Sequence, residues 1–339
     1  MNKLTKIGAS ALCGSLAAIS SANAGDLSVT GGVDMSWQSM EDAVTGNPIG
    51  IGSNLTFSGS GELDNGWSVA LSVAHANSNA YSNTNVVVGV PSIGDIRIDQ
   101  GTSGTGIDRM DDMTPTVWEE AYGTGLSSGI VNAAGGSAGS GIEITPSALT
   151  PDGVTVRLAY TPDAGGNNAG DKAGSGVSTS VANSAWDLTV ELSSDVTGVD
   201  GLTLYGGIAE VTQDTTNSTT DDDKSEEVIG FTYAMSNWTF GYQVSDIDLG
   251  KSSGATKYDN AGYGITFNVN DDLSVGYNYY ESEQSNSTNN KVEATSLQVA
   301  YTMGGASFRL AEAEVDNANY STAASSDIKA TTLSVSLAF

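Results

Sequence analysis

The chain of 339 residues has little of what most enzyme and metal sites require. It contains one cysteine, Cys13, and one histidine, His75. Such a sequence offers no disulfide framework, no cysteine–histidine zinc site and scarcely a base for a catalytic serine. Neither a G-x-S-x-G elbow nor a phosphate-binding loop with its lysine is present. We therefore predict a protein that is not an enzyme, has no catalytic residues and has no resident metal or cofactor.

Basic residues are scarce as well. Lysine and arginine together number 12 against 40 aspartates and glutamates, which gives a formal net charge of -28. A surface of this sign repels the phosphate backbone, so nucleic acid is excluded as a partner. High negative charge with few aromatic residues can also indicate disorder, but the regular periodicity described below argues against it.

Long apolar runs are missing, so the sequence predicts no membrane-spanning helix. The first 24 residues do have the pattern of a secretory signal peptide: Lys3 and Lys6, an apolar stretch over 7–19, and Ala22-Asn23-Ala24 as the cleavage motif. We expect cleavage after Ala24, which leaves one domain over 25–339. Without the two signal lysines its formal net charge is -30.

What the sequence has in abundance is alternation of apolar and small polar residues, the pattern of half-exposed β-strands. Sixteen such segments follow one another along the mature chain, separated by turns such as Asp64-Asn65-Gly66. The segments cover 27–37, 54–64, 67–73, 86–90, 96–98, 142–144, 154–160, 186–192, 202–208, 229–233, 238–244, 263–269, 273–279, 297–301, 306–310 and 333–339.

The connections between these segments alternate in length. Short turns alternate with long polar loops, among them 38–53, 101–140, 161–184, 212–224 and 248–258. A soluble sandwich or a β-solenoid would also alternate, but its outer face would carry many lysines and glutamates. Here the face opposite the apolar one is rich in Thr, Ser, Gly and Asn, which suits a wet lumen. We predict an all-β fold, a 16-stranded antiparallel transmembrane barrel of the bacterial outer membrane.

Several stretches support a resemblance to a known family. The chain resembles the general porins of Gram-negative bacteria, 16-stranded and of the alphaproteobacterial type, in the opening strand "GDLSVTGGVDMSW", the hairpin "GELDNGWSVALSV", the long region after "GDIRIDQG" and the ending "TTLSVSLAF". The resemblance implies a homotrimer in the outer membrane, with each barrel narrowed by a long loop inside its lumen. It also implies that the barrel-assembly machinery reads the last strand, through Leu333, Val335, Leu337 and Phe339.

The region 101–140 is the longest connection, and long irregular loops in compact folds are usually functional. We interpret it as the pore-constricting loop; the alternative is a solvated acidic surface loop. Its charged candidates for the constriction are Asp108, Arg109, Asp111, Asp112, Glu119 and Glu120.

Charged wall positions follow from strand alternation, because neighbours of outward apolar residues point inward. By this rule Arg97, Arg157 and Arg309 face the lumen, either at the narrowest point or as structural partners of carboxylates. More numerous are the inward carboxylates Asp34, Glu62, Asp95, Asp99, Glu143, Asp187 and Glu191. Charged rings select ions by sign, so this excess predicts a preference for cations.

Two acidic stretches, 219–227 and 281–284, could bind Ca²⁺ or Mg²⁺ and bridge the protein to lipopolysaccharide. A solvated acidic rim is the simpler interpretation, because the sequence lacks a calcium-loop pattern. Outward Gly31, Gly59 and Gly61 suggest a subunit-contact face.

The sequence as a whole predicts a water-filled channel for passive diffusion of small hydrophilic solutes and ions. One alternative is a substrate-selective porin, for which Tyr205 and Tyr280 are the candidate aromatic residues of the lumen. Another is a non-conducting barrel that acts through its loops as an adhesin or receptor.

Overall fold

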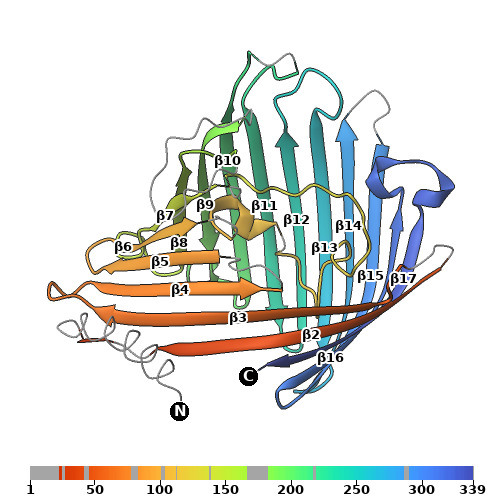
Figure 1. The fold of residues 1–339 in the computed structure, drawn as a ribbon, viewed down its shortest axis with the longest axis horizontal. Coiled ribbons are helices and arrows are strands. Elements are labelled where there is room, and N and C mark those ends of the chain that lie inside the picture. The colour runs from red at the N-terminus through yellow and green to blue at the C-terminus, as the bar shows by residue number, and fades with distance from the viewer. Residues whose placement is uncertain are drawn as a thin grey trace, which may run out of the picture.

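The computed structural model describes residues 23–24, 27–41, 46–77, 83–100, 104–111, 113–136, 139–165, 182–216, 219–285 and 290–338. Most of the expected signal peptide, together with Asp112 and Phe339, lies outside this part of the chain. The described residues form one antiparallel sheet in which each strand pairs with the next in sequence (Figure 1). The last strand pairs back with the first long one, with Leu337 opposite Val33. The sheet is therefore closed, and the predicted 16-stranded barrel is confirmed.

The strands of the barrel are β2 (Ser28–Glu41), β3 (Ile49–Glu62), β4 (Ser68–Ala76), β5 (Asn83–Val90), β6 (Gly94–Gln100), β7 (Gly141–Thr145), β8 (Val154–Thr161), β9 (Ala182–Leu192), β10 (Leu202–Gln213), β11 (Lys224–Met235), β12 (Trp238–Asp248), β13 (Lys257–Asn268), β14 (Leu273–Ser285), β15 (Asn290–Met303), β16 (Ala306–Asp316) and β17 (Ile328–Ala338). A two-residue strand, β1 (Asn23–Ala24), pairs with β3. The short helices are η1 (Gly106–Met110), α2 (Ser194–Thr197), η2 (Ala318–Tyr320) and η3 (Ala324–Ser326). None of the described helices is long and apolar enough to cross a bilayer.

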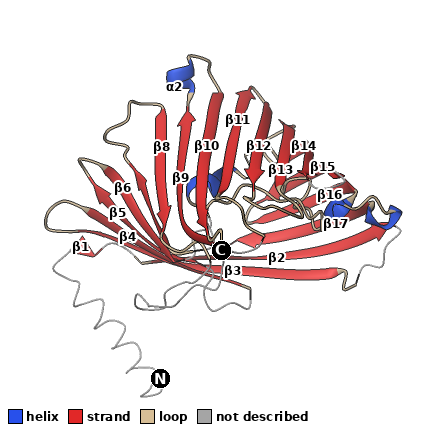
Figure 2. Cartoon of the chain, turned by 90° about the horizontal axis from the view of Figure 1, so that it is seen from above, coloured by secondary structure: helices blue, strands red, loops and turns tan. Residues whose placement is uncertain are grey.

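Large apolar side chains on the outer face explain why the strands close into a barrel rather than a soluble sandwich. Ile51, Ile229 and Leu297 point outward and are 71%, 64% and 59% exposed. In lipid such exposure is favourable, and closure leaves no unpaired strand edge in the hydrocarbon layer. Figure 2 shows the strands, in red, as one continuous wall with η1, in blue, beside β9.

Several strands extend beyond the predicted apolar segments. Pairing in β2 continues to Glu41, β3 begins at Ile49, and β11 begins at Lys224. The predicted loops 38–53 and 212–224 are thus partly strand. Backbone hydrogen bonding between strands does not depend on side-chain polarity. The strands therefore extend beyond the lipid-facing residues from which the alternation of apolar side chains predicts them.

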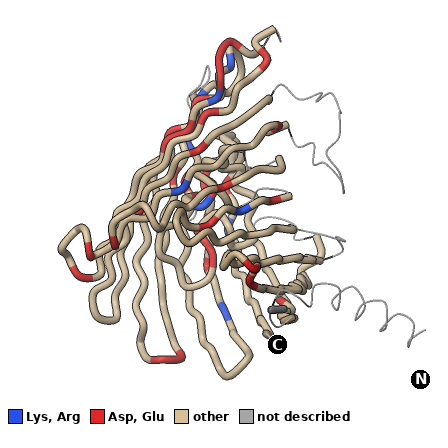
Figure 3. Tube along the Cα trace, turned by 90° about the vertical axis from the view of Figure 1, so that its left-hand side faces the viewer, with Lys and Arg blue, Asp and Glu red and all other residues tan. Residues whose placement is uncertain are grey.

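The short turn after β3 has the geometry that its sequence predicts. Gly66 has a φ of 80°, which favours glycine, and the Leu63 backbone N–H donates to the Trp67 carbonyl oxygen at 2.8 Å. At the other end of the barrel the connections are longer. Acidic positions greatly outnumber basic ones along the trace (Figure 3).

The described part of the chain buries its apolar core inside the barrel rather than between two sheets. Loop residues Ala121 and Leu126 pack against inward residues of the wall, including Ile247, Val292 and Val315. A second cluster joins Ile107 and Met110 of η1 to Tyr205 and Val228. Both clusters lie between the β6–β7 connection and the wall from β10 to β17, so that connection occupies one side of the lumen.

Candidate channel constriction

The connection between β6 and β7 contains η1 near its beginning and then crosses the inner side of β10 to β15 (yellow to olive in Figure 1) before it returns to β7. We call the described parts of this connection, 104–111, 113–136 and 139–140, the constriction loop. Side chains of the barrel wall hold it along its whole course.

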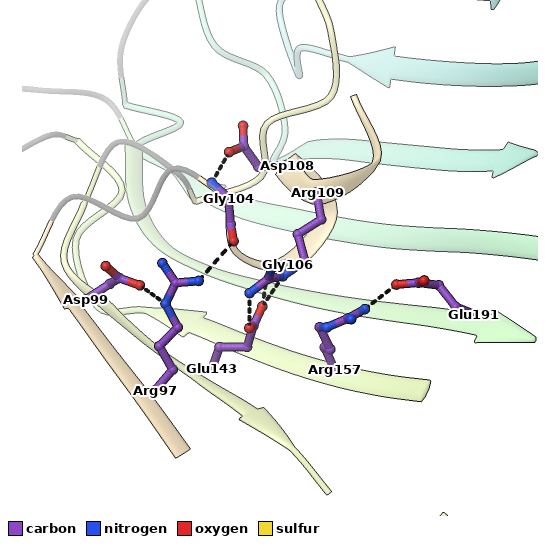
Figure 4. A network of polar contacts seen from close by, with 9 residues as sticks. All are labelled: Arg97, Asp99, Gly104, Gly106, Asp108, Arg109, Glu143, Arg157 and Glu191. Atoms are coloured by element: carbon purple, nitrogen blue, oxygen red, sulfur yellow. Dashed lines mark hydrogen bonds and ion pairs between the residues drawn. The ribbon is translucent and has the colours of Figure 1, made fainter. Parts of the chain in front are cut away.

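The first part of the constriction loop is fixed by four charged residues (Figure 4). Glu143 on β7 accepts hydrogen bonds from the Gly106 backbone N–H at 2.8 Å and from Arg109 Nε and Nη2 at 3.1 and 2.5 Å. Arg97 on β6 is ion-paired with Asp99 and donates to the Gly104 carbonyl oxygen at 3.4 Å. The contact of Arg109 with Glu143 is charge-assisted and has two hydrogen bonds, so it fixes the orientation of the two side chains as well as their distance.

Two further wall carboxylates hold the constriction loop, and one of them connects its beginning to its end. Asp187 on β9 lies between Gly106 and Gly135, and its carboxylate accepts from the backbone N–H groups of Ile107 and Gly136. Both glycines have positive φ, 55° and 53°, and a Cβ on either would collide with Asp187. On β11, Glu226 accepts from the backbone N–H groups of Ala134 and Gly135 at 2.8 and 2.6 Å.

Amide side chains of the wall fix the middle of the constriction loop. Asn278 on β14 accepts from the Ala121 backbone N–H at 2.8 Å and donates to Thr114 Oγ1 at 3.1 Å. Gln298 on β15 accepts from the Trp118 backbone N–H at 3.1 Å and donates to the Glu119 carbonyl oxygen. These contacts satisfy backbone groups that a strandless segment would otherwise leave unpaired.

Inward glycines make room for the loop backbone where it crosses the wall. A Cβ at Gly264 on β13 would overlap the Pro115 carbonyl oxygen, and one at Gly241 on β12 would overlap the Pro115 ring. At Gly276 on β14 the nearest atom would be Val117 Cγ1 at 3.2 Å. Sequence reasoning missed these positions, although glycine inside a strand is the usual sign that another backbone approaches closely.

The acidic candidates of the constriction loop have different surroundings. Asp108 accepts from the Gly104 backbone N–H at 2.5 Å, and the Asp111 carbonyl oxygen accepts from the Tyr122 hydroxyl at 3.2 Å. Glu119 and Glu120 belong to the stretch held by Gln298 and Asn278. Asp112 lies outside the described residues.

All four arginines of the chain are ion-paired. Besides Arg97 and Arg109, Arg157 pairs with Glu191, and Arg309 pairs with Asp34 at 3.4 Å. Of the remaining inward carboxylates, Glu62 and Asp95 have no ion pair among the described residues. The arginines therefore add little net positive charge to the lumen.

Three of the carboxylates predicted to line the pore are inward-facing but buried. Asp99, Glu143 and Asp187 are 3%, 3% and 4% exposed, because the constriction loop or a neighbouring arginine covers them. Alternation predicts the face of a residue but carries no information about what covers that face. Tyr205 and Tyr280 are likewise buried; their hydroxyls donate to Gln243 Oε1 at 2.9 Å and Asn132 Oδ1 at 3.1 Å.

The two acidic stretches do not converge on a metal-binding geometry in the part of the chain that the structure describes, where no group of three or more acidic or histidine side chains is placed to hold an ion. Two of their carboxylates are instead paired with lysines, Glu226 with Lys224 and Glu281 with Lys291.

Two tyrosines outside the strands are buried, and burial favours the neutral form of each hydroxyl. Burial raises the pKa of Tyr122 in the constriction loop, and the neighbouring Tyr280, Glu120 and Asp111 act in the same direction. Burial also raises the pKa of Tyr320 in η2. Both hydroxyls therefore stay protonated above the ordinary pKa of tyrosine.

Comparison with known proteins agrees with this geometry. The Gram-negative porin family matches residues 8–320. The chain belongs to this family. A porin of this family is an outer-membrane channel protein, and the outer membrane is where the chain resides. No curated protein sequence matches it.

Solved structures share the fold of this porin at low sequence identity. OmpT of Vibrio cholerae is 14% identical, with a TM-score of 0.67 over 93% of this chain and 98% of that one. The anion-selective porin from Comamonas acidovorans is 13% identical, with a TM-score of 0.68 over 94% and 100%. Salmonella typhi OmpF, in complex with daunomycin, is 11% identical, with a TM-score of 0.68 over 93% and 98%.

Proposed function

We propose that this porin forms a water-filled channel for passive diffusion of small hydrophilic solutes and ions, and that it is not an enzyme. One observation carries the proposal: no inward side chain of β2 to β5 is fully buried, whereas the inner wall from β9 to β17 contains many that are. The constriction loop covers the second region and leaves most of the first open to solvent; at the end of β2, Gln38 lies next to Gly125 and Met40 packs against the cluster of Ala121 and Leu126.

Small polar residues dominate the uncovered wall. Ser36, Asn54, Ser60 and Asn85 face inward there, each exposed or half-buried. Hydroxyl and amide groups hydrate a passage without binding any one solute strongly, which is what a general diffusion channel needs.

The charge distribution supports a preference for cations. Each arginine is balanced by a carboxylate, while Glu62 and Asp95 face the lumen without an ion pair among the described residues. The anion selectivity of the Comamonas porin does not bear on this point, because 13% identity shows the fold alone.

A homotrimer is the assembly that we propose. Vibrio cholerae OmpT has a structure in a trimer form, and the outer face of β2 and β3 offers the small residues Gly31, Gly59 and Gly61, all half-buried. Chemical cross-linking of native membranes should yield a trimer; a monomer alone would contradict this assembly. Contacts with lipopolysaccharide and with the barrel-assembly machinery through Leu333, Val335 and Leu337 remain predictions.

Single-channel recording in planar bilayers tests the proposed function. We expect steady ohmic conductance that added sugars or amino acids do not block. Block by one solute class would favour a substrate-selective porin. A correctly folded trimer that does not conduct would contradict the channel and favour an adhesin or receptor.

A further inference from the structure

The last long loop, Asn317–Asp327 between β16 and β17, bends into the barrel and contacts the constriction loop. We call it the terminal loop. Its two short helices η2 and η3 give it structure, and the Asn317 backbone N–H donates to Asp327 Oδ1 at 3.0 Å, which closes its base. Ala318 and Tyr320 of η2 are buried, at 4% and 6% exposure, in the same apolar cluster as Ala121 and Leu126 of the constriction loop.

The backbone of the terminal loop adopts an uncommon conformation at this contact. Asn317, Asn319 and Tyr320 have φ values of 56°, 57° and 57°. Asparagine tolerates the left-handed region, but tyrosine rarely occupies it. Residues in such conformations persist only where their surroundings hold them, and they gather at functional sites. The contacts of Tyr320 must therefore hold its backbone in this conformation.

Tyr320 contacts three strands of the wall and the constriction loop at once. Its hydroxyl lies 2.7 Å from Ser282 Oγ on β14 and accepts from the Val131 backbone N–H of the constriction loop. Its ring packs against Tyr258 of β13, with centroids 5.4 Å apart. Its carbonyl oxygen accepts from Asn290 Nδ2 of β15 at 2.5 Å.

The neighbouring residue adds a direct contact between the two loops. The Asn319 backbone N–H donates to the Ser128 carbonyl oxygen at 2.7 Å. Gly129 follows immediately, and a Cβ there would approach Asn319 Oδ1 to 2.5 Å and Asn319 Cα to 2.9 Å. The two backbones thus pass at a distance that only glycine allows.

We propose that Tyr320 is a positioning residue of the channel: through it the terminal loop holds the 126–131 part of the constriction loop against the wall. The constriction is then built from two loops, and its width depends on a contact far in sequence from the charged residues of η1. This inference rests on the proposed channel function.

Tyr320→Ala tests the role of the side chain in single-channel recordings of the full-length trimer. We expect current noise in the open channel to rise several-fold, because the 126–131 segment loses the contacts of the Tyr320 side chain that fix it to the wall. Tyr320→Phe keeps the ring against Tyr258 but loses the hydroxyl contacts, so its noise should be intermediate. Ser325→Ala, an exposed position in the same loop, is the matched control and should behave as wild type.

Gly129→Ala tests the same contact from the constriction loop and remains informative if Tyr320→Ala fails to fold. It should raise the noise as Tyr320→Ala does, and the double variant should be no noisier than the worse single variant. The inference would be overturned if the Tyr320→Phe and Gly129→Ala channels fold and show no more current noise than Ser325→Ala. Absence of conductance in the wild type would instead contradict the channel function itself.

Discussion

A glycine at an inward position of β13 determines how close the constriction loop can come to the wall. Gly264 faces the Pro115 carbonyl oxygen, and no other residue type leaves space for it. The proline cannot move toward the wall and has no backbone N–H to bond elsewhere. At the scale of single residues, missing side chains therefore shape the passage as much as the charged ones do.

We expect Gly264→Ala to displace the constriction loop from the wall toward the open side of the lumen. The added methyl group would overlap Pro115, and a well-packed site relieves such overlap by moving the softer partner. Single-channel conductance should fall, while heat-modifiable migration in gels should still report a folded barrel.

Gly276→Ala is the control for this change. The nearest atom to its new methyl group would be Val117 Cγ1 at 3.2 Å, a side-chain contact that a small rotation relieves. It should leave the conductance close to that of wild type. Equal conductance in Gly264→Ala and wild type would mean that Pro115 does not touch the wall as described.

At the scale of the strand, the alternation of faces makes a sharper prediction than any single residue. Ile229 on β11 faces lipid and is 64% exposed, whereas Ser58 on β3 faces the lumen from the uncovered wall. An arginine at mid-membrane on the lipid face destabilises a barrel by about 2–4 kcal/mol. Ile229→Arg should show this loss in urea unfolding from vesicles, and Ser58→Arg should not. Equal losses would contradict the assignment of faces.

At the scale of the loop, alkaline pH should release the packing of the lumen. The raised pKa values of Tyr122 and Tyr320 stabilise the packed loops fully below the ordinary tyrosine pKa of about 10. That stabilisation is lost as the pH rises through the higher pKa values of the folded state. Current noise should therefore increase above pH about 10, and less so in Tyr122→Phe. Noise independent of pH would argue that these hydroxyls are not buried.

The strands could be predicted from the sequence, but the attachment of the constriction loop could not. Lipid-facing alternation repeats within each strand, so even the short segment 96–98 is recognisable between its neighbours. The loop depends on contacts such as Asn278 with Ala121 and Gln298 with Trp118, which join residues 157 and 180 positions apart. No local pattern encodes such a contact. The inward glycines could have indicated where the loop backbone approaches the wall, since strand alternation already assigns them to the inner face.

At the scale of the whole molecule, the barrel closes and the lumen divides into two unlike halves. The wall from β10 to β17 is covered by the constriction loop, with buried apolar packing between them. The wall from β2 to β5 is mostly uncovered, apart from Gln38 and Met40 at the end of β2, and carries hydroxyl and amide groups. Because all four arginines are ion-paired, the net charge of the passage comes from carboxylates. From this charge distribution we expect the channel walls to favour cations.

The reversal potential of the channel under a KCl gradient tests this account most directly. Carboxylates without a cationic partner attract K⁺ and repel Cl⁻, so the sign should be that of a cation-preferring channel, and high salt should weaken the preference by screening. Glu62→Gln should reduce it, whereas Glu312→Gln, which removes the same charge from the outer face, should not. A reversal potential of the opposite sign in the wild-type channel would contradict the account.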